Sequence, residues 1–98
     1  MKQKSNKHTL SQYQLTIHGH VQGVFFRQSS LAIATQLKLA GWVTNNSNKT
    51  VSILIMGPNE ACQQMITWCH KGPSKATVTN LEIKQETPTY HNKPFIIQ

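Results

Sequence analysis

A predicted β-strand is joined to a predicted α-helix by the stretch Gly19-His20-Val21-Gln22-Gly23-Val24-Phe25-Phe26-Arg27. Before it, apolar and polar residues alternate from residue 13 to residue 18, which is the period of a half-buried strand. After it, side chains that suit a buried helix face recur at helical spacing, at Phe26, Ser30, Ile33, Leu37 and Ala40. Gly41 follows this pattern and is expected to end the helix.

The rest of the chain continues the alternation of strands and helices. A hairpin is predicted from strands at 42–46 and 50–56, and the second of these is apolar on both faces, as in a central strand. A helix is expected to begin at Gly57-Pro58-Asn59-Glu60 and to stop at Lys71-Gly72-Pro73. Strands at 76–85 and 95–97 complete the order βαββαβ plus a terminal strand. This order predicts a ferredoxin-like α+β sandwich, with an antiparallel sheet, two helices on one face and a short fifth strand.

The length of 98 residues, 38% of them hydrophobic, suits a single compact domain. Residues 1–11 are polar, carry lysines and show no period, so we expect a mobile tail there and a folded domain over 12–98. Three of the ten basic residues lie in this tail, so the net charge of +7 leaves the domain only moderately basic. We therefore expect no nucleic-acid partner.

Several features indicate the cytoplasm. No apolar stretch resembles a secretory signal or is long enough to span a bilayer, so we expect no membrane association. Cys62 and Cys69 are interpreted as free thiols, which suits a reducing compartment. The chain has no Asp and only three Glu, and its His and Cys residues form no convincing ligand cluster, so neither a metal nor a cofactor is expected.

The stretch 19–27 has the properties of a phosphate cradle. Unpaired backbone N–H groups and the positive end of a helix meet where a loop enters a helix, and an anion can bind there without a metal. Gly19 and Gly23 allow the backbone to bend around a bound group. Arg27, the only arginine of the chain, stands at the exit, and its planar fork of donors matches the oxygens of a phosphate.

These residues resemble the acylphosphatase family. The stretch 19–27 fits that family's signature G-x-V-Q-G-V-x-F-R without a mismatch, and Gly41-Trp42-Val43-Thr44-Asn45 resembles the start of its second signature. The resemblance covers nearly the whole chain from Tyr13 onwards. Two positions depart from the family pattern, because Thr44 stands where the family usually has Arg and Lys49 where it usually has Gly. A left-handed Lys49 would be strained, so the turn is expected to differ or to move its strained residue to Asn48.

The resemblance implies hydrolysis of the carboxyl-phosphate bond of acyl phosphates. It implies that Arg27 binds the phosphoryl group together with the backbone N–H groups of Gln22, Gly23, Val24, Phe25 and Phe26. It further implies that Asn45 orients the attacking water and that no side chain forms a covalent intermediate. Inorganic phosphate or sulfate is then expected to inhibit, and we expect a monomer.

Three other interpretations are less consistent with the sequence. A non-catalytic ferredoxin-like module could bind a small phosphorylated ligand or RNA, but the strand at 50–56 lacks the aromatic residues on which bases stack. A general base at His18 or His20 is conceivable, although alternation places His18 away from the core. A cysteine-based phosphatase needs a Cys that heads a loop ending in Arg, and neither Cys62 nor Cys69 precedes an arginine.

Overall fold

The computed structural model describes residues 9–89 and 93–98. Five strands and two helices follow one another along this part of the chain. Their bounds are β1 Leu10–His20, α1 Phe26–Gln36, β2 Ala40–Asn45, β3 Val51–Pro58, α2 Asn59–Cys69, β4 Thr77–Glu86 and β5 Phe95–Ile97. The predicted ferredoxin-like α+β class is confirmed.

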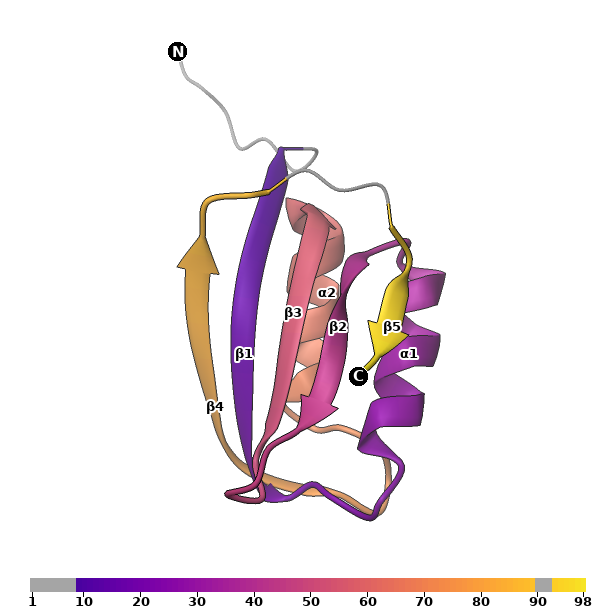
Figure 1. Ribbon diagram of the computed structural model, residues 1–98, viewed down its shortest axis with the longest axis vertical. Helices are drawn as coiled ribbons and strands as arrows, with labels where there is room; N and C mark the ends of the chain where they lie inside the picture. The colour runs from indigo at the N-terminus through magenta and orange to yellow at the C-terminus, as the bar shows by residue number, and fades with distance from the viewer. Residues whose placement is uncertain (1–8, 90–92) are drawn as a thin grey trace.

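The strands form one sheet in the order β4-β1-β3-β2-β5 (Figure 1). The β1–β3, β1–β4 and β2–β3 pairs are antiparallel, as expected. The short β5 instead runs parallel to β2, with Val43 opposite Ile97, so the expectation of a purely antiparallel sheet is wrong at this edge. The reason lies in the sheet topology, because β4 ends and β5 begins at the same end of the sheet but on opposite edges, so that β5 runs in the direction of β2 (Figure 1).

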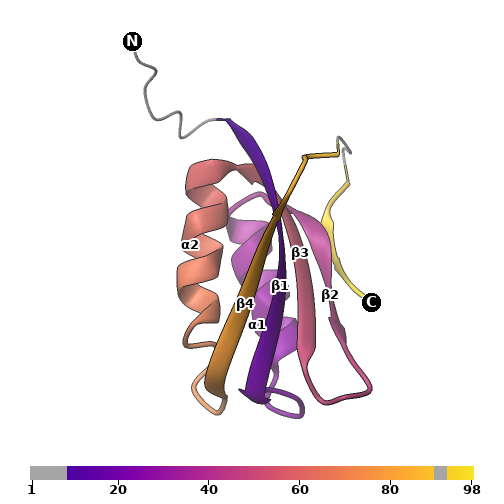
Figure 2. The same cartoon turned by 90° about the vertical axis from the view of Figure 1, so that its left-hand side faces the viewer.

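Both helices cover the same face of the sheet, as predicted (Figure 2). The alternating apolar residues of the two central strands are fully or almost fully buried in the core between sheet and helices, namely Tyr13, Leu15, Ile17, Val51, Ile53 and Ile55. The helices contribute further residues to the same core, namely Phe26 and Ala34 from α1 and Cys62, Met65 and Cys69 from α2. Burial of this cluster is the main stabilising contribution to the fold.

Helix α1 ends earlier than predicted, and Gly41 is not its stop. The helix ends at Gln36, and Lys38 takes the left-handed conformation with φ 60°. The Lys38 N–H then donates to the Thr35 carbonyl oxygen (3.1 Å) and the Leu39 N–H to that of Ala34 (2.9 Å), the pattern of a Schellman motif. Gly41 lies inside β2 with φ 137°, where an added Cβ would lie 1.8 Å from the Leu54 carbonyl oxygen. Its lack of a side chain therefore permits close strand pairing.

The folded part also begins earlier than expected. Residues 1–8 of the predicted tail lie outside the described residues, but Leu10 and Ser11 belong to β1. They extend the ladder because β3 continues to Pro58, which lies opposite Leu10. A polar residue such as Ser11 can join a strand when its backbone N–H and C=O groups find hydrogen-bond partners on the neighbouring strand. The alternation of apolar and polar side chains does not reveal such backbone pairing.

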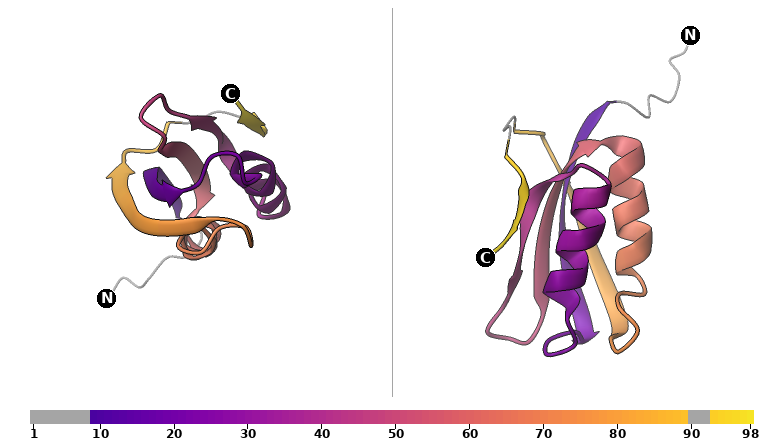
Figure 3. Two further views of the ribbon diagram at one scale, coloured as in Figure 1. Left: turned by 90° about the horizontal axis from the view of Figure 1, so that it is seen from below. Right: turned by 90° about the vertical axis from the view of Figure 1, so that its right-hand side faces the viewer.

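Two segments that are distant in sequence lie at one end of the sheet. The loop 21–25 between β1 and α1 and the turn 46–50 between β2 and β3 both lie at the lower end of Figure 1. In the right-hand view of Figure 3 both loops lie at the lower end of the molecule, the β1–α1 loop below α1 and the β2–β3 turn below the sheet. The start of α1 and the end of β2 are thereby brought together.

Candidate active site

The loop 21–25 leads into α1 without a side-chain cap. Phe25, the residue before the helix, is left-handed with φ 66° and makes no side-chain capping hydrogen bond. The first helical bond runs from the Ser29 N–H to the Phe25 carbonyl oxygen (2.9 Å). Within the described residues, no loop or turn hydrogen bond uses the N–H groups of residues 22–28 as donors. These free donors and the positive helix end make the loop a strong candidate for anion binding.

The loop keeps its shape through one glycine and one buried aromatic ring. Gly23 has φ 76°, a conformation that glycine adopts at little cost, and the space beside its Cα is open. Phe26, the first residue of α1, is 2% exposed and packs its ring against Trp68, with ring centroids 5.3 Å apart. The start of the helix is thus anchored in the core, while its neighbour Arg27 stays exposed.

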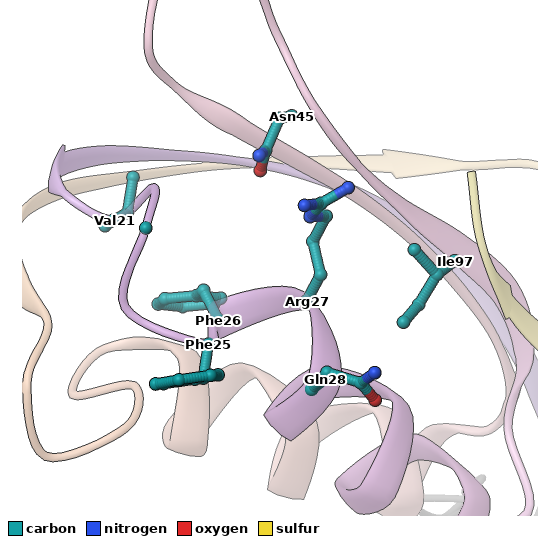
Figure 4. A pocket seen from close by; sticks show the side chains of 8 residues that line it. Val21, Phe25, Phe26, Arg27, Gln28, Asn45 and Ile97 are labelled. Carbon is teal, nitrogen blue, oxygen red and sulfur yellow. The ribbon is translucent and has the colours of Figure 1, made fainter.

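Arg27 and Asn45 point toward one another across a pocket of about 440 Å³ (Figure 4). The pocket is lined by Val21, Gly23, Phe25, Phe26, Arg27, Gln28, Asn45 and Ile97. In the described part of the chain no Asp or Glu carboxylate lies within ion-pair distance of the Arg27 guanidinium, so none neutralises its charge there. The guanidinium can therefore offer its charge to an anion in the pocket.

Asn45 is the last residue of β2 and lies opposite Val51 at the start of β3. It follows Val43 on the same side of the strand, because alternate residues share a face, and Val43 is fully buried. Among the described residues, its side-chain amide has no hydrogen-bond partner. Both the donor and the acceptor of this amide remain available to a water molecule.

The structure brings together most, but not all, of the predicted site residues. Gly23, Phe25, Phe26, Arg27 and Asn45 line the same pocket. Two predicted residues do not line it with their side chains. Val24 is 5% exposed and belongs to the hydrophobic core. The Gln22 side chain is bonded to the β2–β3 turn.

Three lining residues were missed from the sequence, namely Val21, Gln28 and Ile97. Val21 and Gln28 are the chain neighbours of the predicted binding residues 22–27, so their proximity was a usable signal. Ile97 is different, because it reaches the pocket through the parallel pairing of β5 with β2, supported by the Gln98 N–H bond to the Val43 carbonyl oxygen (2.8 Å). Nothing in the local sequence of residues 95–97 indicates that pairing.

The two departures from the family pattern have different consequences. Lys49 is itself left-handed with φ 75°, so the expected shift of strain to Asn48 is wrong. Asn48 instead accepts hydrogen bonds from the Thr50 N–H (3.2 Å) and hydroxyl (2.6 Å). Thr44 is half-buried and does not line the pocket, because it alternates with Asn45 along β2.

The alternative catalytic groups lie elsewhere. His18 pairs with Glu82 across β1 and β4, and His20 does not line the pocket. Cys62 and Cys69 are buried thiols on α2, and burial raises the pKa of Cys62 to about 11 and that of Cys69 to about 12. Both are therefore neutral at pH 7 and poor nucleophiles.

In residues 9–89 and 93–98, no three His, Cys, Asp or Glu side chains gather as a metal site would require. Neither described helix has the length and apolar character needed to cross a membrane.

Comparisons with known proteins find relatives that match most of the chain. The family model described as Acylphosphatase matches residues 13–97. An acylphosphatase of Azoarcus sp. is 40% identical over 81 residues, covering 83% of this chain and 83% of the relative. One from Thermococcus kodakarensis is 45% identical over 74 residues, covering 76% and 81%. The crystal structure of acylphosphatase from Bacillus subtilis superposes with a TM-score of 0.86 at 33% identity, covering 92% of this chain and 99% of that one.

Proposed function

The chain belongs to the acylphosphatase family, and we propose that the pocket between Arg27 and Asn45 is where it hydrolyses acyl phosphates. The enzyme is an acylphosphatase, which converts the mixed anhydride of a carboxylic and a phosphoric acid to a carboxylate and inorganic phosphate. The observation that supports the site most strongly is the uncapped start of α1, with its free N–H groups and Arg27 on one pocket wall and Asn45 on the other.

In the proposed mechanism, the phosphoryl oxygens are bound by the N–H groups of residues 22–26 and by the Arg27 guanidinium. These donors are free of other partners in the described part of the chain, so they stabilise charge without first breaking protein hydrogen bonds. The Asn45 amide holds a water molecule in line with the bond between phosphorus and the acyl oxygen. Water attacks phosphorus, that bond breaks, the carboxylate leaves, and a phosphoryl oxygen of the substrate takes the proton of the water.

Hydrolysis of an acyl phosphate requires little from the enzyme beyond positioning of the water and stabilisation of the phosphoryl charge. A carboxylate is a good leaving group, so no side chain has to protonate it. The described residues that line the pocket include no carboxylate and no imidazole. Positioning and electrostatic stabilisation can then supply most of the rate acceleration. We propose on this basis that catalysis needs no metal ion. We further propose that the protein is a monomer in the cytoplasm, a reducing compartment that suits the free thiols of Cys62 and Cys69.

The proposal is tested by an assay of benzoyl phosphate hydrolysis in excess chelator. We expect full activity, because Arg27 and the backbone donors supply the positive charge that a metal would otherwise provide. Inorganic phosphate and sulfate are expected to inhibit competitively and to raise the melting temperature, since they occupy the same donors. Activity that is lost in chelator and restored by a divalent cation would overturn this account.

A further inference from the structure

Gln22 lies in the phosphate loop, yet its side chain turns away from the pocket and crosses to the β2–β3 turn. Its Nε2 donates to the carbonyl oxygen of Asn46 (2.8 Å) and to that of Thr50 (3.0 Å). Asn46 and Thr50 are the two residues that close the turn, because the Asn46 N–H donates to the Thr50 carbonyl oxygen (2.9 Å). One amide nitrogen thus bonds both sides of the turn at its base.

The turn that receives these bonds is itself held by several others. The Asn46 Nδ2 donates to the hydroxyls of Thr50 (2.9 Å) and Ser52 (2.7 Å). The Lys49 N–H donates to the Asn46 carbonyl oxygen (3.1 Å). Thr50 and Ser52 are both buried. Because these polar groups satisfy one another, the turn is a defined structure to which a second loop can be fixed.

Asn46 is bonded directly to Asn45 in the chain, so the position of the turn sets the position of the Asn45 amide. Gln22 in turn belongs to the loop whose N–H groups face the phosphate. Among the described residues, the two bonds of Gln22 are the only hydrogen bonds that join the loop 21–25 to the turn 46–50. Gln22 lies 24 residues before Asn46 and 28 residues before Thr50 in the sequence. Its side chain therefore links the two halves of the site, which come from separate parts of the chain.

We propose that Gln22 is a positioning residue, whose amide fixes the Asn45 side chain relative to the phosphate cradle. This inference rests on the proposed function of Asn45. Its physical basis is the steep dependence of rate on geometry, since a misplacement of about 1 Å can cost roughly a hundredfold in turnover. Binding of phosphate depends on the loop and Arg27 alone, so Gln22 acts on turnover more than on affinity.

The substitution Gln22→Met tests the proposal, because Met has a similar length and shape but offers no donor. We expect kcat for benzoyl phosphate to fall roughly tenfold or more, with little change in the inhibition constant of inorganic phosphate. The fold is expected to persist, because the Asn46 and Thr50 carbonyl oxygens each keep another hydrogen bond, from Lys49 and Asn46 respectively. Gln36→Met, at the exposed end of α1, is the matched control and is expected to leave kcat unchanged.

A double-mutant cycle with Asn45→Ala separates positioning from a general structural effect. If Gln22 acts through Asn45, Gln22→Met is expected to lower kcat in the parent enzyme and to have little further effect in the Asn45→Ala background. An equal loss in both backgrounds, or a folded Gln22→Met enzyme with parental kcat, would overturn the inference. Gln22→Asn, whose amide is one methylene too short to span both carbonyls, gives the same comparison if the Met variant does not fold.

The double-mutant cycle also distinguishes a failure of the proposed role of Asn45 from a failure of the proposed role of Gln22. If Asn45→Ala alone retains parental kcat, the proposed role of Asn45 fails and the inference for Gln22 fails with it. If Asn45→Ala loses kcat while the effects of the two substitutions simply multiply, the role of Asn45 stands and only the inference for Gln22 is overturned.

Discussion

Arg27 combines a backbone held in the first turn of α1 with a charge that has no carboxylate partner among the described residues. Its backbone belongs to the first turn of α1, which is anchored by the packing of Phe26 on Trp68. Its guanidinium extends across the pocket toward Asn45 (Figure 4). A planar fork of donors can hold two phosphoryl oxygens at once, whereas a lysine ammonium acts as a single point charge. The geometry of the side chain, and not only its charge, is therefore central to the proposed site.

Replacement of Arg27 by lysine is expected to lower kcat/KM by roughly a hundredfold or more, the order found when one transition-state donor is removed. Inhibition by inorganic phosphate is also expected to weaken, because the same guanidinium binds the phosphoryl group of the substrate and the phosphate product. The measurement is steady-state kinetics with benzoyl phosphate, with circular dichroism as the folding control. An Arg27→Lys enzyme that nearly matches the parent would contradict the clamp role.

Among the elements, the β2–β3 turn carries visible backbone strain. Within the turn 46–50 the Lys49 N–H donates to the Asn46 carbonyl oxygen, and Lys49 is left-handed. Hairpin loops of this kind favour glycine at the left-handed position. The strain is tolerated because the surrounding side-chain bonds of Asn46, Asn48 and Thr50 hold the turn in place.

Lys49→Gly is expected to raise the free energy of unfolding by roughly 0.5–1 kcal/mol. Relief of a left-handed non-glycine residue is worth about 1–2 kcal/mol, and the greater freedom of glycine in the unfolded chain offsets part of it. Ser47→Gly is the control, since Ser47 is exposed in the same turn and is not left-handed. Denaturant unfolding that shows both variants to be destabilised alike would refute the strain argument.

The elements also show where sequence patterns suffice and where they do not. Strand alternation correctly predicted the buried Tyr13, Leu15 and Ile17 of β1, because burial of one face imposes the period directly. In β3 the apolar residues on both faces correctly indicated a strand that is buried on both sides. The end of α1 was misplaced because Gly41 is a strong helix-stop signal, whereas the left-handed residue is Lys38. Burial of Leu39 just after it shows that tertiary packing stabilises this end and outweighs the local preference for glycine.

At the scale of the whole molecule, the site is assembled from three separate parts of the chain. The stretch 19–27 and the segment 41–45 were identified from the sequence, and the fold brings both to one pocket. The third part, β5 with Ile97, could not be predicted, because its parallel pairing depends on how the chain crosses the molecule. The long-range bonds of the Gln22 side chain were hidden for the same reason.

The central claim is that this assembly gives Arg27 and Asn45 different tasks. The phosphate is bound by the loop and Arg27, while Asn45, on the facing strand, places the water. Loss of the Asn45 amide is therefore expected to slow the chemical step and to leave the phosphate cradle intact. Since the side chain has no protein hydrogen-bond partner in the described part of the chain, its removal is expected to leave the fold unchanged.

The most direct test is kcat for benzoyl phosphate together with the inhibition constant of inorganic phosphate, in the parent enzyme and in Asn45→Ala. We predict a fall in kcat of roughly a hundredfold or more and a nearly unchanged inhibition constant, with an unaltered circular dichroism spectrum. A folded Asn45→Ala enzyme that keeps parental kcat, or that loses phosphate binding as fully as Arg27→Lys, would contradict the account.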